Sequence, residues 1–195
     1  MNNTGIVILA AGSSTRLGEP KQLLPFHNKT LLQHVIDEAA AAGAAPVIVV
    51  TGAKAEEVAA SIDNGKATII FNEKWQQGKA SGIVAGVRAI MASNQPVQNL
   101  IIAVCDQPFV TASLFARLYQ TQRDTGRHIV ASAYANTTGT PVLFTRKYFD
   151  HLLGLKGEEG AKKLLMAYNE DVATVAFPQG HIDIDTKDDY EQLLR

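Results

Sequence analysis

Two basic side chains near the N-terminus, Arg16 and Lys21, belong to a loop built mostly from small residues. An apolar run, Ile6-Val7-Ile8-Leu9, precedes the loop, which then reads Ala10-Ala11-Gly12-Ser13-Ser14-Thr15-Arg16-Leu17-Gly18-Glu19-Pro20-Lys21. Small residues let backbone N–H groups approach phosphate oxygens, and the two cations would neutralise the charge that the amides cannot. The pattern therefore predicts a loop that binds a triphosphate group.

The loop differs from the commoner phosphate-binding motifs. A Walker A loop ends in Gly-Lys-Ser/Thr, whereas Lys21 is followed by Gln22. A dinucleotide fingerprint needs three glycines in the pattern G-x-G-x-x-G, whereas this loop has only Gly12 and Gly18. The alternative interpretation is a plain Gly/Ser turn after a strand.

Three carboxylates follow or flank other extended segments. Asp106 comes directly after the apolar run 100–104, and Asp183 and Asp185 alternate along residues 181–186, so that both can point to one side. One or two carboxylates together with phosphate oxygens are the ligands that Mg²⁺ prefers. The alternatives are a turn-forming aspartate before Pro108 and an Asp185 that only favours a helix N-terminus.

A further segment, residues 72–83, follows a predicted strand and enters a predicted helix. Gly78, Ser81 and Gly82 allow close backbone approach, and the helix N-terminus offers free N–H groups to a ligand. The alternative is an ordinary helix start with Ser81 as its cap and Trp75 in the core.

The elements that must position these residues alternate between strand and helix. Strands are expected at residues 6–9, 47–50, 67–71, 100–104, 128–133, 141–144 and 172–177. The expected helices have apolar stripes that include Leu31 to Ala40, Val58 with Ile62, Ile83 to Met91, Leu114 to Leu118, Ala161 to Tyr168, and Leu193 with Leu194. Thr111 and Thr186 are expected helix caps, Gly43 a helix stop, and residues 136–140 a loop. This alternation predicts a three-layer α/β/α sandwich, with ligands at the C-terminal ends of the strands.

The length and composition of the chain exclude several classes of protein. We expect the 195 residues to form a single domain, and a hydrophobic content of 46% is typical of a soluble globular chain. The net charge of −1 argues against nucleic acid or an anionic membrane as a partner. The single cysteine, Cys105, rules out an internal disulfide. No apolar run approaches the ~20 residues of a membrane helix, and the N-terminus does not resemble a signal peptide, so we expect a cytoplasmic protein.

Residues 9–21 resemble the signature L-A-A-G-x-S-x-R-x-G-x-x-K of the MobA-like nucleotidyltransferases. Within that superfamily the sequence is most similar to the molybdenum cofactor cytidylyltransferases. Guanylyl-transferring relatives usually have Leu-Ala-Gly-Gly here, so Ala11 favours cytidine. The resemblance implies a mostly parallel, Rossmann-like sheet of the nucleotide-diphospho-sugar transferase type.

The resemblance also implies roles for individual residues. Lys21, Arg16 and Asp106 would be catalytic, and Asp106 would bind Mg²⁺, or Mn²⁺, with Asp183 or alternatively Asp185. The nucleotide would contact the following residues: Leu9, Ala10, Ala11, Gly12, Ser13, Ser14, Arg16, Lys21, Gly78, Ser81 and Gly82. Gly139, Pro141 and Gly160 would lie on the acceptor side. The sequence departs from the family at Lys187-Asp188, where Pro-Glu is usual, and at Glu158, where Asp is usual.

The expected activity is transfer of CMP from CTP to the phosphate of a molybdopterin-type cofactor. The implied further partner is a molybdoenzyme or its dedicated chaperone. The alternatives are another phosphate acceptor (a sugar phosphate, phosphocholine or a polyol phosphate) and a non-catalytic nucleotide-binding module. The missing G-x-G-x-x-G argues against a dehydrogenase. The five histidines show no metal-ligand spacing.

Overall fold

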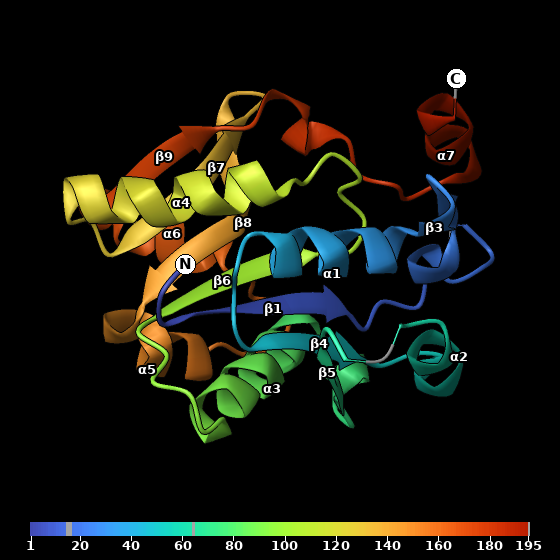
Figure 1. The fold of residues 1–195 in the computed structure, drawn as a ribbon, viewed down its shortest axis with the longest axis horizontal. Coiled ribbons are helices and arrows are strands. Elements are labelled where there is room, and N and C mark those ends of the chain that lie inside the picture. Colours follow the sequence, from blue (N-terminus) through green and yellow to red (C-terminus); the bar gives the residue numbers. More distant parts are fainter. Residues whose placement is uncertain (15–16, 64, 195) are drawn as a thin grey trace.

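The computed structural model describes residues 1–14, 17–63 and 65–194 (Figure 1). Within these ranges the main sheet has the strand order β5-β4-β1-β6-β8-β7-β9. The strands are β1 (Thr4–Ala10), β4 (Val47–Thr51), β5 (Thr68–Phe71), β6 (Asn99–Val104), β7 (Ile129–Tyr134), β8 (Thr137–Thr145) and β9 (Val172–Ala176). All neighbours pair in parallel except β8, which is antiparallel to β6 and to β7. The predicted mostly parallel sheet is confirmed.

The central strands are buried on both faces because their side chains are apolar at nearly every position. Ile6 and Ile8 of β1 belong to one apolar cluster, whereas Val7 between them belongs to the cluster on the opposite face. Val7 lies in register with Ile48 of β4 and Ile102 of β6. Helices must therefore cover both faces of the sheet.

Two layers of helices provide this cover (Figure 1). One layer contains α1 (Leu31–Ala41), α2 (Ala55–Ala60) and α4 (Ala112–Thr125). The other contains α3 (Lys79–Ala92), α5 (Phe149–Leu153) and α6 (Lys162–Ala167). Thr111 caps α4 as expected, and Gly43 follows α1 with a φ of 75°. The predicted three-layer α/β/α sandwich is confirmed, and none of the described helices is both long and apolar enough to span a membrane.

A smaller cluster joins the N-terminal and C-terminal segments. The hairpin of β2 (Pro25–Phe26) and β3 (Lys29–Thr30) lies beside α7 (Lys187–Leu193), as Figure 1 shows. Ile184, which is fully buried, packs there with Phe26 and other apolar side chains. Short 3-10 helices complete the fold: η1 (Lys21–Leu23), η2 (Trp75–Gln77), η3 (Arg146–Tyr148), η4 (Asn169–Asp171) and η5 (Pro178–His181). This contact fixes residues 182–185 close to the N-terminal loop.

Three sequence-based expectations are wrong in detail. Residues 137–140 belong to strand β8 rather than to a loop, because Ala135 and Asn136 form a tight turn with φ of 45° and 58°. Met91 is 43% exposed, since the buried stripe of α3 runs through Ile83, Val87 and Ile90, and the next residue points outward. Leu194 is 60% exposed because it lies beyond the last residue of α7.

Candidate active site

A cavity of about 920 Å³ lies where the parallel strands end. Leu9 of β1, Val104 of β6 and Tyr134 of β7 all line it. Ligands of open α/β sheets bind at this edge, and the volume suits a nucleotide together with part of a second substrate. The cavity therefore lies at the edge of the sheet where the sequence predicts ligand binding.

Hydrogen bonds hold the N-terminal loop at the cavity wall. The Lys21 backbone N–H donates to Ser14 Oγ at 3.1 Å. The Gln22 side chain donates from Nε2 to the carbonyl oxygens of Ala10 and Gly12, at 2.8 and 3.0 Å. The loop is thereby anchored to the segment that follows it. Thr15 and the predicted phosphate-binding Arg16 lie outside the described residues.

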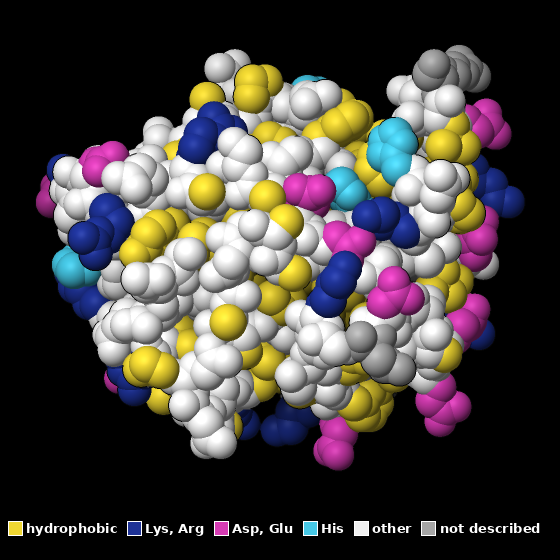
Figure 2. All heavy atoms as spheres, viewed as in Figure 1, with side chains coloured by type: hydrophobic (Ala, Val, Ile, Leu, Met, Phe, Trp, Pro, Cys, Tyr) yellow, Lys and Arg dark blue, Asp and Glu magenta, His cyan; other side chains and the backbone are white. Residues whose placement is uncertain are grey.

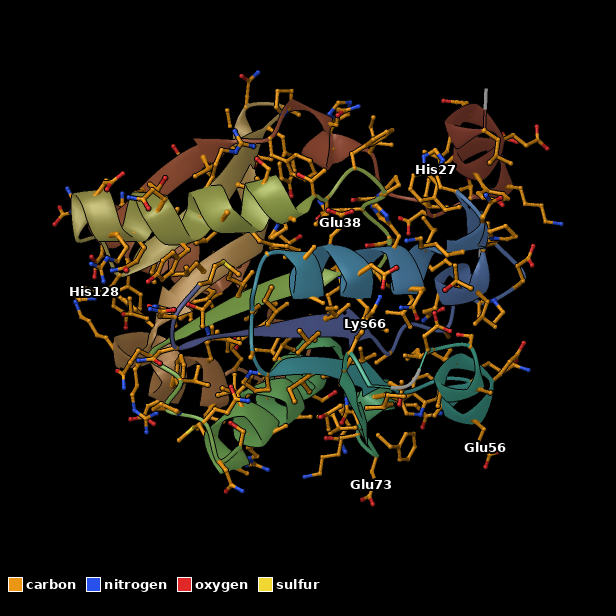
Figure 3. The ribbon with its side chains drawn as sticks, in the orientation of Figure 1. His27, Glu38, Glu56, Lys66, Glu73 and His128 are labelled. Carbon is orange, nitrogen blue, oxygen red and sulfur yellow. The ribbon has the colours of Figure 1, made fainter. Side chains whose placement is uncertain are left out.

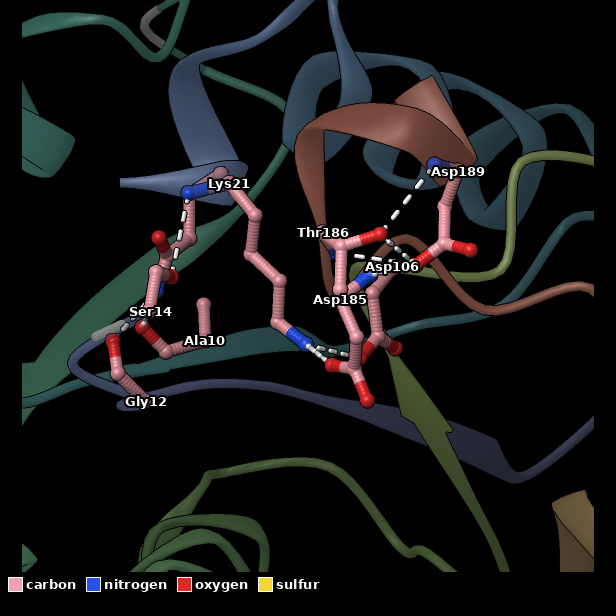
Figure 4. A network of polar contacts seen from close by, with 9 residues as sticks. Ala10, Gly12, Ser14, Lys21, Asp106, Asp185, Thr186 and Asp189 are labelled. Carbon is pink, nitrogen blue, oxygen red and sulfur yellow. Dashed lines mark hydrogen bonds and ion pairs between the residues drawn. The ribbon is translucent and has the colours of Figure 1, made fainter. Parts of the chain in front are cut away.

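The ammonium group of Lys21 lies between two carboxylates (Figure 4). Its Nζ donates to Asp106 Oδ2 and, at 2.9 Å, to Asp185 Oδ1. Burial would lower the pKa of Lys21, but attraction to Asp106 and the two hydrogen bonds outweigh it and raise the pKa. Lys21 is therefore fully charged at neutral pH.

Asp183 and Asp185 both reach the cavity because Ile184 between them is turned into the core. The Ile184 backbone N–H donates to the Asp106 carbonyl at 3.1 Å, which places the two segments side by side. Although much of the Asp183 residue is exposed, its carboxyl group is partly withdrawn from water. This burial, together with repulsion from Asp106 and Asp185, raises the pKa of Asp183 to about 6.

The carboxylates fit a hard divalent cation by their chemistry. Asp106 Oδ1 is buried and accepts no hydrogen bond from any described residue, so it has a lone pair available to a metal. As the described side chains stand, no three His, Cys, Asp or Glu residues are arranged to hold an ion together. Lys21 lies between Asp106 and Asp185, so a cation bound to both would require Lys21 to move aside.

Helix α3 begins at the wall of the cavity that the sequence predicts to bind the nucleotide. Its N-cap is Gly78, with a φ of 100°, so the alternative of Ser81 as the cap is wrong. Ser81 Oγ instead donates to the Gly78 carbonyl at 2.8 Å and accepts a hydrogen bond from Asn72 Nδ2 at 2.8 Å. A Cβ on Gly78 would lie 2.4 Å from the Gly157 carbonyl oxygen, so only glycine fits against that loop.

Hydroxyl groups dominate the acceptor side that the resemblance implied. Tyr134 and the threonines of β8 line the cavity there, together with Gly139. A Cβ on Gly139 would lie 2.3 Å from the Tyr134 hydroxyl oxygen, so the glycine makes room for the phenol ring. Lys162 adds a positive charge and donates to Thr137 Oγ1 at 3.0 Å.

Most of the predicted site residues meet at this one cavity. It is lined by Leu9, Ala11, Gly12, Ser13, Lys21, Gly78, Ser81, Gly82, Asp106, Gly139, Gly160, Asp183 and Asp185. Ala10, Ser14 and Pro141 do not line it; Ala10 and Ser14 support the loop through hydrogen bonds, and Pro141 is buried. The cavity is also lined by residues for which the sequence predicts no individual role: Gln22, Asn72, Trp75, Gln76, Lys79, Tyr134, Thr137, Thr138, Thr140 and Lys162.

Other reactive side chains lie elsewhere or are inert. His27 and His128 are at opposite ends of the molecule (Figure 3). Cys105 is buried, and that burial raises the pKa of its thiol to about 12, so it is neutral near pH 7. On the face seen in Figure 2, acidic and basic side chains are interspersed, in keeping with the net charge of −1.

Comparison with known proteins identifies related sequences. The family model described as "MobA-like NTP transferase domain" matches residues 6–172. Nicotine blue oxidoreductase of Paenarthrobacter nicotinovorans is 33% identical over 138 residues, which are 70% of this chain and 65% of that protein, just under two thirds of its length. Molybdenum cofactor cytidylyltransferase of Escherichia coli K12 is 24% identical over 191 residues, covering 97% of this chain and 95% of that protein.

Solved structures show the same architecture over the whole chain. Rv0371c from Mycobacterium tuberculosis H37Rv is 31% identical with a TM-score of 0.82, covering 99% of this chain and 98% of that one. A crystal structure of Rv0371c in complex with manganese gives 29% identity and a TM-score of 0.76, with 98% and 97% of the two chains covered. A divalent cation is thus present in a structure of a similar protein.

Proposed function

The chain belongs to the MobA-like NTP transferase family and is a nucleotidyltransferase, and we propose that it transfers CMP from CTP to the phosphate of a molybdenum cofactor. The observation that supports the nucleotidyl-transfer chemistry of this proposal is the contact of Lys21 with Asp106 and Asp185 beside the small-residue loop. It brings a lysine, carboxylates for a cation and backbone amides for phosphate to one cavity.

The reaction needs charge neutralisation more than proton transfer. A phosphate monoester has its second pKa near ~6, so the attacking oxygen is already anionic at neutral pH. That oxygen attacks the α-phosphorus of the triphosphate, the bond from this phosphorus to the bridging oxygen breaks, and pyrophosphate leaves. Lys21 would stabilise the charge that develops on the α-phosphate. Arg16 and the amides of Gly12 to Thr15 would hold the two phosphates that leave.

Asp106 and Asp183 would hold Mg²⁺ or Mn²⁺, with Asp185 as the alternate to Asp183. When bound, the ion would supply positive charge that lowers the repulsion between the attacking phosphate and the triphosphate. The buried, unpartnered Asp106 Oδ1 supports this assignment. Lys21 would then turn from the carboxylates toward the nucleotide.

The proposed specificity for cytidine and for the cofactor is supported by one residue and by one relative. Ala11 stands where the guanylyl-transferring relatives usually have glycine, and the 24% identical Escherichia coli relative is named for cytidylyl transfer to the molybdenum cofactor. A second candidate is another phosphate acceptor, because the acceptor side of the cavity is lined by groups that recognise a phosphate monoester without selecting a pterin. Hydroxyl groups and Lys162 on the acceptor side would suit any polar phosphate monoester.

A pyrophosphate-release assay tests both parts of the proposal. It crosses ATP, CTP, GTP and UTP with molybdenum cofactor, a sugar phosphate, phosphocholine and a polyol phosphate, each with and without Mg²⁺ or Mn²⁺. We expect release only with CTP and molybdenum cofactor, and only with a divalent cation. Preference for GTP would overturn the cytidine assignment, and release only with another acceptor would overturn the cofactor assignment.

A further inference from the structure

Gln22 is fully buried, although its side chain carries two polar groups. Its Nε2 donates to the carbonyl oxygens of Ala10 and Gly12, so both N–H bonds of the amide are used on the phosphate loop. Its Oε1 is buried and accepts no hydrogen bond from the part of the chain that the structure describes. Burying an unpartnered oxygen destabilises a fold, so the two hydrogen bonds to the loop must offset this cost.

We infer that Gln22 is a positioning residue that aims the backbone amides of the loop at the triphosphate. In a planar trans peptide, the carbonyl of one residue and the N–H of the next point in opposite directions. Drawing the carbonyls of Ala10 and Gly12 toward Gln22 therefore turns the N–H groups of Ala11 and Ser13 away from it. Both of these residues line the cavity.

The chemistry of the loop explains why a glutamine suits this position. One nitrogen with two N–H groups can bind two carbonyls at once, whereas a carboxylate would repel both and an apolar side chain would leave both unpaired. Gln22 also directly follows Lys21, so the residue that orients the loop is adjacent in the chain to the residue that contacts Asp106 and Asp185. The inference rests on the proposed phosphate role of the loop and is independent of the acceptor.

The test compares Gln22→Met with a matched variant, Gln33→Met. Gln33 is also buried and uses both ends of its amide, donating to Asp37 Oδ1 at 3.0 Å and accepting from the Asp63 N–H at 2.9 Å, but it does not line the cavity. For each variant we would measure the Kd of pyrophosphate by calorimetry with Mg²⁺, the KM values of CTP and acceptor, and the Tm.

Loss of the two loop hydrogen bonds in Gln22→Met should raise the pyrophosphate Kd and the KM of CTP roughly tenfold, with the acceptor KM unchanged. Gln33→Met should lower the Tm and leave all three constants at wild-type values. If Gln22→Met lowers only the Tm, Gln22 is merely structural and the inference is wrong. If pyrophosphate does not bind the wild type, the proposed phosphate loop itself fails. Should Gln22→Met not fold, Gln22→Asn keeps the amide on a side chain too short to reach both carbonyls and is expected to raise the same two constants.

Discussion

Replacing Asp183 with asparagine keeps the shape of the side chain and removes a charge that the fold disfavours. The pKa of Asp183 is raised from 3.8 to about 6 by burial and by Asp106 and Asp185. A pKa shift of this size corresponds to about 3 kcal/mol of destabilisation of the folded protein by the charged carboxylate. Because the residue is exposed, solvent screens the charge and we expect about 1 kcal/mol. Because the pKa of Asp183 in the folded state lies above its ordinary value, the free energy of unfolding of the wild type falls by this amount as pH rises from about 4 to 6.

The assay is urea unfolding of wild type and Asp183→Asn at a series of pH values from 4 to 8 without divalent cations. The variant should match the wild type near pH 4 and be about 1 kcal/mol more stable above pH 6. Adding Mn²⁺ should then stabilise the wild type more than the variant, because the carboxylate would bind the ion.

Asp171→Asn is the contrasting control. Burial alone would raise the pKa of Asp171, but hydrogen bonds from Lys147, the His128 amide and Tyr148 lower it to about 2. This variant should lose about 2 kcal/mol at neutral pH, and the loss should disappear as pH falls toward 2. If Asp183→Asn is as destabilising as Asp171→Asn at pH 7, or if its effect does not change with pH, the electrostatic account of the carboxylates is wrong.

Three further variants test the site. Lys21→Ala should keep its fold, but its turnover rate should fall by a factor on the order of 10²–10³. Its affinity for Mn²⁺ without nucleotide should rise, because no ammonium group competes with the ion for Asp106. Activity like that of the wild type would refute the role of Lys21. Gly78→Ala should raise the KM of both substrates in steady-state assays, because its Cβ would collide with the Gly157 carbonyl at 2.4 Å; unchanged constants would show that this contact does not shape the site. Thr186→Ala removes the side chain that caps α7 and should cost about 1 kcal/mol in urea unfolding; no loss would mean that the cap does not hold the helix.

The local sequence pattern was enough to predict which strands carry this site and at which edge of the sheet it lies. Apolar runs in β1 and β6 predicted buried parallel strands, and parallel strands place the residues after them at one edge of a sheet. The loop after β1 and Asp106 after β6 were therefore expected at the same edge, and the pairing of β1 with β6 in the structure makes them neighbours. The alternation of Asp183 and Asp185 around an apolar Ile184 likewise predicted that both acids face the same side.

The contacts that decide the chemistry depend on tertiary packing, which no local pattern contains. The pairing of Lys21 with Asp185 joins positions 164 residues apart and depends on α7 packing against the β2–β3 hairpin. The role of Gln22 became visible only when its amide was placed beside two carbonyls of the loop. The preference for Asp183 over Asp185 as the second metal ligand stays a prediction.

The most direct test of the central claim follows the phosphorus atoms of CTP. Wild-type protein would be incubated with Mg²⁺, molybdenum cofactor and CTP carrying radioactive phosphorus at either the α or the γ position, and the products separated. Nucleotidyl transfer predicts that the α label enters the cofactor product and that the γ label leaves in pyrophosphate. A γ label found in the cofactor, or released as free phosphate, would mean attack at another phosphorus and would contradict the proposed reaction.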